Sequence, residues 1–183
     1  MKQTISRRIL HLFGWKMEGS IPAELKKFII IVIPHTSNWD FPLGLLVRNV
    51  LNRNVVYLAK ASLFKFPYGG LFKWLGGYPV DRSKRNKFVD TVVDIFNSKE
   101  EFMVCISPEG TRKKVEKLKS GFYWMAKGAQ VPLIMIKFDY GEKVIGIREP
   151  FYTTDDKEGD FEQIWEYFQS ARGKIPENSW GYS

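Results

Sequence analysis

The sequence has little cysteine, little histidine and no long apolar run. Its 183 residues contain two histidines and a single cysteine, Cys105. One cysteine excludes both an internal disulfide and a zinc site built from several cysteines. Cys105 lies in the apolar run FMVCIS, which favours a buried, unreactive thiol over a nucleophile.

The longest apolar run, FIIIVI at 28–33, is far shorter than the roughly 18 residues that a membrane-spanning helix needs. The N-terminus also lacks the pattern of a signal peptide, because side chains that carry or can carry positive charge interrupt its apolar segments: Arg7, Arg8, His11 and Lys16. We therefore expect a cytoplasmic protein, or one that lies peripherally on the inner face of a membrane.

The charge is strongly of one sign. A formal charge of +8 and an isoelectric point near 9.5 predict an anionic partner, whether nucleic acid, a membrane surface or a phosphorylated substrate. Two basic runs, 83–87 and 112–119, are either solvated surface or sites for anionic lipid. At a membrane surface each basic residue contributes about 1 kcal/mol.

Apolar runs of strand length alternate with segments of helical periodicity. Strands are expected at 28–34, 54–60, 78–82, 102–107, 131–138 and 143–151. Helices are expected at 4–17, 40–52, 64–77, 86–99, 119–129 and 161–172. This alternation predicts a single α/β domain over residues 1–183, with a mostly parallel or mixed central sheet covered by helices on both faces.

Two segments keep alternative interpretations. Residues 1–17 are predicted to hold an amphipathic helix, whose 14-residue segment 4–17 would span about 21 Å. It either lies in a membrane interface with its apolar face down or docks on the domain. The aromatic segment 64–78 is either core, or an acyl groove or membrane-facing surface.

The stretch IPHTSNWDF at 33–41 is the first candidate site. His35 follows an apolar strand, and a cap at Ser37 or Asn38 would place Asp40 in the first turn of the next helix. Asp40 could then hold one ring nitrogen of His35 and leave the other free to accept a proton. The alternative is a surface histidine beside a helix cap.

The stretch SPEGTR at 107–112 is the second candidate site, directly after a predicted strand. Functional groups of α/β sheets gather at the carboxyl edge, so we expect Glu109 and Arg112 to lie at the same edge as His35. Gly110 permits a close turn, and an arginine can bind a phosphate through two hydrogen bonds. The alternative is a surface loop with a salt bridge.

Together these stretches resemble two sequence blocks of the glycerolipid acyltransferases, the family typified by 1-acylglycerol-3-phosphate acyltransferase. The first block is a histidine, four residues and an aspartate, matched by His35 and Asp40. The third is a Pro–Glu–Gly–Thr–Arg run, matched at 108–112. The resemblance covers residues 28–140, which form the motif-bearing core.

The two remaining blocks follow in the family's order. The second, glycine-rich block resembles 76–82 and ends at Arg82, with Lys60 at a position where many members carry a lysine. The fourth resembles the apolar strand at 131–134, which is entered through a proline. Two positions depart from the family. Met135 replaces a second proline, a change expected to affect strand geometry or the acyl tunnel. Ser62 replaces an acidic residue, which leaves the identity of the acceptor open.

The resemblance implies an O-acyltransferase. His35 would deprotonate the acceptor hydroxyl while Asp40 orients the ring, and the hydroxyl would attack the thioester of acyl-CoA or acyl carrier protein. Substrate-binding roles fall on Lys60, Arg82, Glu109, Gly110, Thr111 and Arg112. Of these, the three cations would hold an anionic headgroup, Glu109 would orient the basic cluster, and Gly110 and neighbouring amides would stabilise the oxyanion.

The resemblance implies no metal and no cofactor beyond the thioester donor. The expected partners are a lysophospholipid acceptor, most simply 1-acylglycerol 3-phosphate, and an anionic membrane surface, with no nucleic acid. The alternatives are a different lyso-lipid acceptor, or a non-catalytic module that binds anionic lipid or nucleic acid through the same positive charge.

Overall fold

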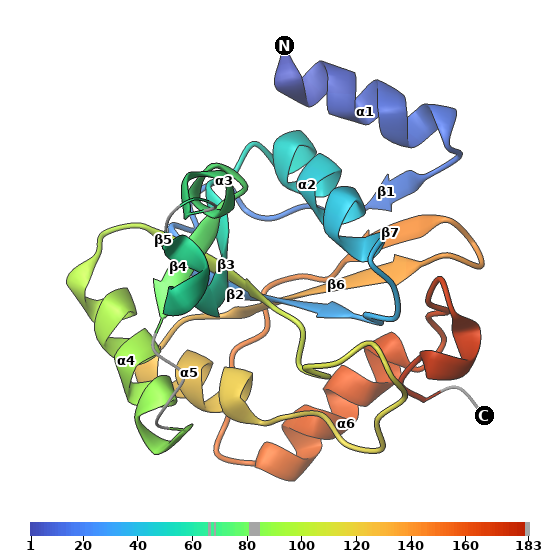
Figure 1. Ribbon diagram of the computed structural model, residues 1–183. Coiled ribbons are helices and arrows are strands. Elements are labelled where there is room, and N and C mark those ends of the chain that lie inside the picture. The colour runs from blue at the N-terminus through green and yellow to red at the C-terminus, as the bar shows by residue number, and fades with distance from the viewer. Residues whose placement is uncertain (66, 68, 81–84, 182–183) are drawn as a thin grey trace.

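A central sheet organises the molecule, which we describe from a computed structural model covering residues 1–65, 67, 69–80 and 85–181 (Figure 1). Its strands are β1 (Lys16–Glu18), β2 (Lys27–Ile33), β3 (Val55–Lys60), β4 (Gly77–Val80), β5 (Phe102–Ile106), β6 (Leu133–Asp139) and β7 (Val144–Ile147). Their order across the sheet is β1-β7-β6-β2-β5-β3-β4. Every neighbouring pair is parallel except β6 and β7, which confirms the predicted α/β class.

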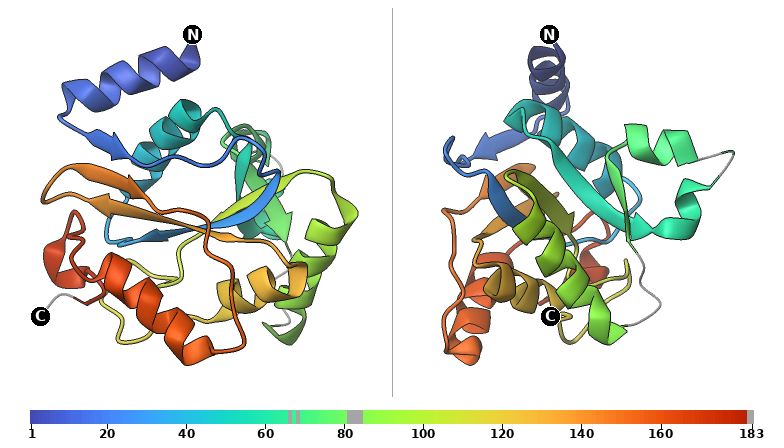
Figure 2. Two further views of the ribbon diagram at one scale, coloured as in Figure 1. Left: turned by 180° about the vertical axis from the view of Figure 1, so that it is seen from behind. Right: turned by 90° about the vertical axis from the view of Figure 1, so that its left-hand side faces the viewer.

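Helices cover both faces of this sheet. They are α1 (Lys2–Leu12), α2 (Asp40–Leu51), α3 (Gly69–Trp74), α4 (Arg85–Ser98), α5 (Gly121–Ala129) and α6 (Lys157–Phe168), with short 3₁₀ turns η1 (Ala61–Phe64) and η2 (Pro176–Asn178). Figures 1 and 2 show α1 and α2 on one side and α4, α5 and α6 on the other. The helices predicted for these regions are confirmed, with boundaries shifted by a few residues.

Strand β2 illustrates why both faces must be covered. Phe28 and Ile30 pack against the α2 side, whereas Ile29 and Ile31 pack against the opposite side, and all four are buried. Successive side chains of a strand point to opposite faces, so a strand buried on both sides reads as a continuous apolar run. Burying each such side chain stabilises the fold by about 1.5–3 kcal/mol.

The N-terminal segment differs from its prediction beyond residue 12. The helix α1 ends at Leu12, and Gly14 adopts φ +78°, a left-handed conformation that glycine reaches without strain. The chain then enters β1, which pairs in parallel with β7. The prediction of a helix through residue 17 is therefore wrong at its C-terminal end, where pairing with a strand about 130 residues distant prevails.

Helix α1 docks on α2. Its buried residues are Ser6 and Leu10, and the Gln3 side-chain amide donates a hydrogen bond to the carbonyl of Val50 at 2.8 Å. The docked alternative for this helix is thus confirmed for one of its faces. Large apolar side chains at and just beyond the helix remain exposed: Ile5, Leu12 and Phe13. Among the described residues, no helix combines the length and apolarity required to cross a bilayer.

The aromatic segment 64–78 divides between the two interpretations. Phe64 and Phe72 contact each other, with ring centroids 6.1 Å apart. Trp74, in contrast, is 76% exposed. The strand predicted at 78–82 ends at Val80, and its last two positions lie outside the described residues.

Candidate active site

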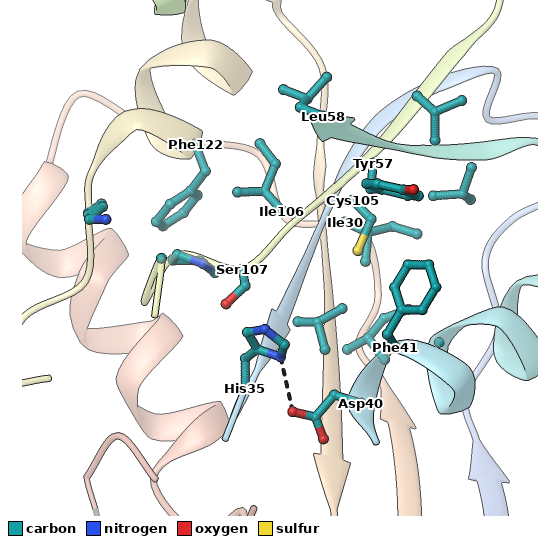
Figure 3. Close-up of a pocket in the computed structure, with 18 of the residues that line it drawn as sticks. Ile30, His35, Asp40, Phe41, Tyr57, Leu58, Cys105, Ile106, Ser107 and Phe122 are labelled. Atoms are coloured by element: carbon teal, nitrogen blue, oxygen red, sulfur yellow. Dashed lines mark hydrogen bonds and ion pairs between the residues drawn. The ribbon is translucent and has the colours of Figure 1, made fainter. Parts of the chain in front are cut away.

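The two candidate stretches meet at the carboxyl edge of the sheet. β2 and β5 are adjacent and parallel, with Ile31 opposite Ile106, so the loops that follow them leave the sheet side by side. Figure 3 shows His35 from the first loop and Ser107 from the second at this edge. The sequence prediction that both stretches share one edge is confirmed.

His35 and Asp40 form a hydrogen-bonded pair (Figure 3). Nδ1 of His35 lies 3.0 Å from Oδ2 of Asp40, and the same oxygen accepts the backbone N–H groups of Thr36 and Ser37, each at 2.9 Å. An oxygen that already accepts two amide hydrogens acts as an acceptor for the ring too, so we assign the ring hydrogen to Nδ1. Nε2 then carries a free lone pair.

The local sequence creates this geometry in a way that differs from our expectation. Trp39, not Ser37 or Asn38, is the N-cap residue of α2, and no side-chain hydrogen bond caps the start of this helix. Asp40 is instead the first helical residue, and its carboxylate folds back onto the amides that precede the helix. The helix start thereby fixes the carboxylate beside His35.

Tyr140 is a member of this site that the sequence analysis missed. Its hydroxyl donates a hydrogen bond to Oδ1 of Asp40 at 2.8 Å across 100 residues of sequence. Burial, reinforced by the Asp40 carboxylate, raises the pKa of Tyr140 above the usual range of a phenol, so the hydroxyl stays protonated as a donor. Nothing in the local sequence around Tyr140 signals this contact.

Glu109 is buried and joins the two loops of the site. Its carboxylate is 2% exposed and accepts hydrogen bonds from the backbone N–H of His35 at 2.8 Å and the hydroxyl of Ser107 at 3.3 Å. Within the part of the chain that the structure describes, no Lys or Arg lies within ion-pair distance of it. Glu109 thus ties the histidine loop to the loop that follows β5. Its expected role in orienting a basic cluster stays a prediction, because Arg82 and the side chain of Lys60 lie outside the described part of the chain.

This burial also changes the acidity of Glu109. Desolvation disfavours a buried carboxylate and raises the pKa of Glu109 to about 7, although the hydrogen bonds from His35 and Ser107 oppose the effect. The adjacent Gly110 has φ +64°, which lets the backbone turn away directly after this buried carboxyl.

A cavity of about 1150 Å³ opens beside His35. Most of its wall is apolar and comes from β2, β3, β5, α2 and the start of α5; it includes Ile30, Phe41, Leu45, Tyr57, Ile106 and Phe122. Gly110, Thr111 and Arg112 line the same cavity, together with Lys119. The cavity therefore joins an apolar chamber, a histidine with a free ring nitrogen and a cationic edge.

Cys105 also lines this cavity and is only partly exposed. Desolvation by the surrounding protein atoms disfavours the thiolate and raises the pKa of the Cys105 thiol to about 12, so the thiol stays protonated near neutral pH. Only the thiolate is an effective nucleophile, and this favours the unreactive interpretation made from the sequence.

Two predicted cations cannot be placed in this geometry. Arg82 lies outside the described residues. Lys60 is the last residue of β3, next to β5 in the sheet, and its description is limited to the backbone. In the described ranges no group of three or more His, Cys, Asp and Glu side chains is arranged to hold a metal ion.

Comparisons with known proteins show the family of this chain. The model of the family described as Acyltransferase matches residues 15–138. The chain is 30% identical to the 1-acyl-sn-glycerol-3-phosphate acyltransferase of Escherichia coli (strain K12) over 137 residues, which cover 70% of this chain and 55% of that protein. It is 28% identical to the human 1-acyl-sn-glycerol-3-phosphate acyltransferase beta, with 81% and 55% covered. The chain thus spans about half the length of the curated relatives that it matches.

Among solved structures, the chain is similar to the 1-acyl-sn-glycerophosphate (LPA) acyltransferase PlsC from Thermotoga maritima. The TM-score is 0.60 at 20% sequence identity, and the match covers 94% of this chain and 80% of the other. At this identity the similarity concerns the fold. Because it covers 94% of the chain, it extends beyond the residues that match the family model.

Proposed function

The chain belongs to the acyltransferase family, and we propose that it transfers a fatty acyl group from a thioester donor to the hydroxyl of a lysophospholipid. The observation that carries the proposal is the His35–Asp40 pair at a largely apolar cavity whose edge holds Arg112. The simplest acceptor is 1-acylglycerol 3-phosphate, the substrate in the names of the relatives. The donor would be acyl-CoA or acyl carrier protein.

His35 acts as the general base in this proposal. Nε2 removes the proton of the acceptor hydroxyl as its oxygen attacks the thioester carbonyl. The new C–O bond forms, the C–S bond breaks, and the proton passes from the imidazolium to the departing thiolate. Asp40 holds the ring and stabilises the positive charge that forms on it. A positioned general base contributes about 10²–10⁴-fold in rate.

The remaining residues position the substrates. The apolar chamber would receive the acyl chain, and Arg112, with Lys60 and Arg82, would bind the phosphate of the acceptor. Gly110 and Thr111 line the same edge of the cavity. The Gly110 N–H donates to the carbonyl of Ser107 at 3.1 Å, so the proposed stabilisation of the oxyanion falls to a neighbouring backbone N–H of this loop. Holding the hydroxyl in an attacking geometry supplies the part of the rate that a base alone does not.

The exposed apolar side chains of the N-terminal segment support a peripheral position on an anionic membrane, at its inner face. Leu12 and Phe13 are 81% and 63% exposed, and Arg7 and Arg8 are exposed nearby. Apolar and basic groups together favour an anionic interface. Replacing both Leu12 and Phe13 by Ser should weaken sedimentation with phosphatidylglycerol vesicles several-fold, and unchanged sedimentation would refute this placement.

The function is tested with a radiolabelled acyl donor and a panel of lyso-lipids that includes 1-acylglycerol 3-phosphate and lyso-aminolipids. Acyl-CoA and acyl carrier protein are offered in parallel. We expect transfer to the phosphate-bearing acceptor and loss of at least about 100-fold in His35→Ala, with an unchanged far-UV circular dichroism spectrum. Transfer only to another lyso-lipid would replace the acceptor. Binding without transfer would indicate a non-catalytic module.

A further inference from the structure

The hydroxyl of Tyr140 donates to the carboxylate oxygen of Asp40 that does not contact the His35 imidazole. Oδ1 accepts the Tyr140 hydroxyl at 2.8 Å, whereas Oδ2 accepts His35 and the two loop amides. Each carboxylate oxygen therefore has its own donor. Rotation of the carboxylate would break bonds at both oxygens at once, in a site where Asp40 is only 4% exposed.

Tyr140 is itself held by two other parts of the chain, the segment at Trp15 and the C-terminal segment. Its backbone N–H donates to the carbonyl of Arg172 at 2.7 Å. The ring of Trp15 meets it edge-on, with centroids 4.9 Å apart and planes at 85°, and the ammonium of Lys174 lies 5.8 Å from its ring centroid. Such contacts fix the ring in place.

Most of this support lies outside the part of the chain that matches the family model, which ends at residue 138. Tyr140, Arg172 and Lys174 all follow it. The segment after Arg172 also contacts the histidine loop, because the backbone N–H of Ile175 donates to the hydroxyl of Thr36 at 3.1 Å. The C-terminal segment thus contacts both the residue that supplies the phenol and the loop that carries His35.

We propose that Tyr140 is a positioning residue for the His35–Asp40 pair, an inference that rests on the proposed function. Its hydroxyl fixes the plane of the carboxylate, so that Nδ1 of His35 remains the donor and Nε2 faces the cavity. Partners that hydrogen-bond an orienting carboxylate set the tautomer and ring orientation of the histidine beyond it. Tyr140 does not line the cavity, so its effect passes through Asp40 and not through substrate contact.

The test compares Tyr140→Phe with Tyr123→Phe. Both changes remove one hydroxyl that a tyrosine donates to an aspartate, at 2.8 Å to Asp40 and at 3.0 Å to Asp160. Tyr123 is buried and Tyr140 is partly buried. With acyl-CoA and 1-acylglycerol 3-phosphate, Tyr140→Phe should lower kcat about tenfold and leave both KM values within about twofold. Tyr123→Phe should keep kcat at the wild-type value per folded molecule. Equal kcat in the two variants would overturn the proposal.

A second measurement does not depend on activity, so it separates this inference from the proposed function. The Nδ1–H proton of His35, held by Asp40, should give a slowly exchanging downfield resonance in the proton NMR spectrum of the full chain. Tyr140→Phe should speed its exchange with solvent about tenfold, whereas Tyr123→Phe should not. An unchanged exchange rate in Tyr140→Phe would overturn the positioning role even if the wild-type protein transfers no acyl group.

Discussion

On each side of the sheet a tyrosine donates to a buried aspartate, and the two pairs differ in their further contacts. Asp40 accepts the hydroxyl of Tyr140 at 2.8 Å, and Asp160 accepts that of Tyr123 at 3.0 Å. Both aspartates are less than 5% exposed and lie in the first turn of a helix, α2 and α6 respectively. Both also accept backbone N–H groups from the residues that precede the helix.

The two pairs differ in their remaining partner. Asp160 also accepts the hydroxyl of Thr154 at 3.0 Å, and Tyr123 donates to the Thr154 carbonyl at 2.9 Å, so that network closes on itself. Asp40 has an imidazole in that place, whose side chain is 24% exposed and lines the cavity. In both pairs a carboxylate binds the backbone at the start of a helix. The Asp40 carboxylate becomes a candidate catalytic group because one of its partners, His35, is accessible to substrate.

The largest effect should separate the two aspartates themselves. In Asp40→Asn the side-chain amide can donate toward Nδ1, which favours the tautomer that carries its hydrogen on Nε2 and removes the base. We expect kcat to fall about 10³-fold, within the range of a lost general base. Asp160→Asn should keep kcat per folded molecule and lower the free energy of unfolding by about 1–3 kcal/mol. Steady-state kinetics and urea denaturation of both variants give these quantities.

The contrast would break in either of two ways. If Asp40→Asn kept more than a third of wild-type kcat, the orienting role of Asp40 would be wrong. If Asp160→Asn lost activity as strongly as Asp40→Asn, at equal folded fraction, the closed network would reach the site by a route that the contacts do not show.

A second buried carboxyl, Glu109, contacts the histidine loop and should make the stability of the protein depend on pH. Its pKa is about 7 in the folded state and about 4.5 without burial. As pH rises, Glu109 therefore loses its proton in the unfolded chain before it does so in the folded protein. The free energy of unfolding falls as pH rises from about 4.5 to 7. Above pH 7 the buried carboxylate costs roughly 3 kcal/mol, at about 1.4 kcal/mol per decade.

Glu109→Gln removes that charge and keeps an acceptor for the His35 amide. Urea denaturation at pH 8 should show the variant to be more stable than wild type by roughly 3 kcal/mol. At pH 4 the two should unfold at nearly the same urea concentration. A difference that stays constant between pH 4 and pH 8 would show that Glu109 titrates normally.

The sequence predicted that the loops carrying His35 and Glu109 lie at one edge of the sheet, but it did not predict the residues that these loops contact. His35 and Glu109 each follow an apolar strand, and the carboxyl ends of neighbouring parallel strands must share an edge. Tyr140 was missed because its contact with Asp40 joins positions 100 residues apart, and no periodicity records such pairing. The burial of Glu109 was not predicted for a similar reason: a charged residue in a glycine-containing loop is usually exposed, and only tertiary packing buries it.

The N-terminal segment shows the same limit. The helical pattern of the N-terminal segment correctly predicted α1, because that signal is local. The strand β1 was not predicted, since its three residues are too few for a strand pattern to stand out, and their pairing partner β7 is distant in sequence. Local patterns therefore define most elements here, while edges and side-chain networks depend on contacts distant in sequence.

Replacing one cation in each of the two regions tests the difference between the Asp40 and Asp160 sites further. Arg112 lines the cavity, whereas Lys127 pairs with Asp155 at 2.9 Å beside the Tyr123 network. Because Arg112 is proposed to bind the phosphate, Arg112→Ala should lower kcat/KM for 1-acylglycerol 3-phosphate about 30-fold, the scale of a lost charge-assisted hydrogen bond. Lys127→Ala should leave this value within about twofold. An equal loss in Arg112→Ala for 1-acylglycerol, which has no phosphate, would contradict the headgroup role.

The smallest effect concerns the cavity, which His35 and Asp40 line and Asp160 does not. Gly44 of α2 lines it, and a Cβ atom added there would meet no heavy atom within 4 Å. Gly44→Leu should therefore fold, since leucine favours a helix over glycine, while its side chain takes space from an acyl chain. We expect the ratio of rates with palmitoyl and octanoyl donors to fall about tenfold, as for a few lost methylene contacts. Gly70→Leu on α3, where an added Cβ is equally free but no cavity is lined, should leave the ratio unchanged, and a similar fall in both variants would show that the acyl chain binds elsewhere.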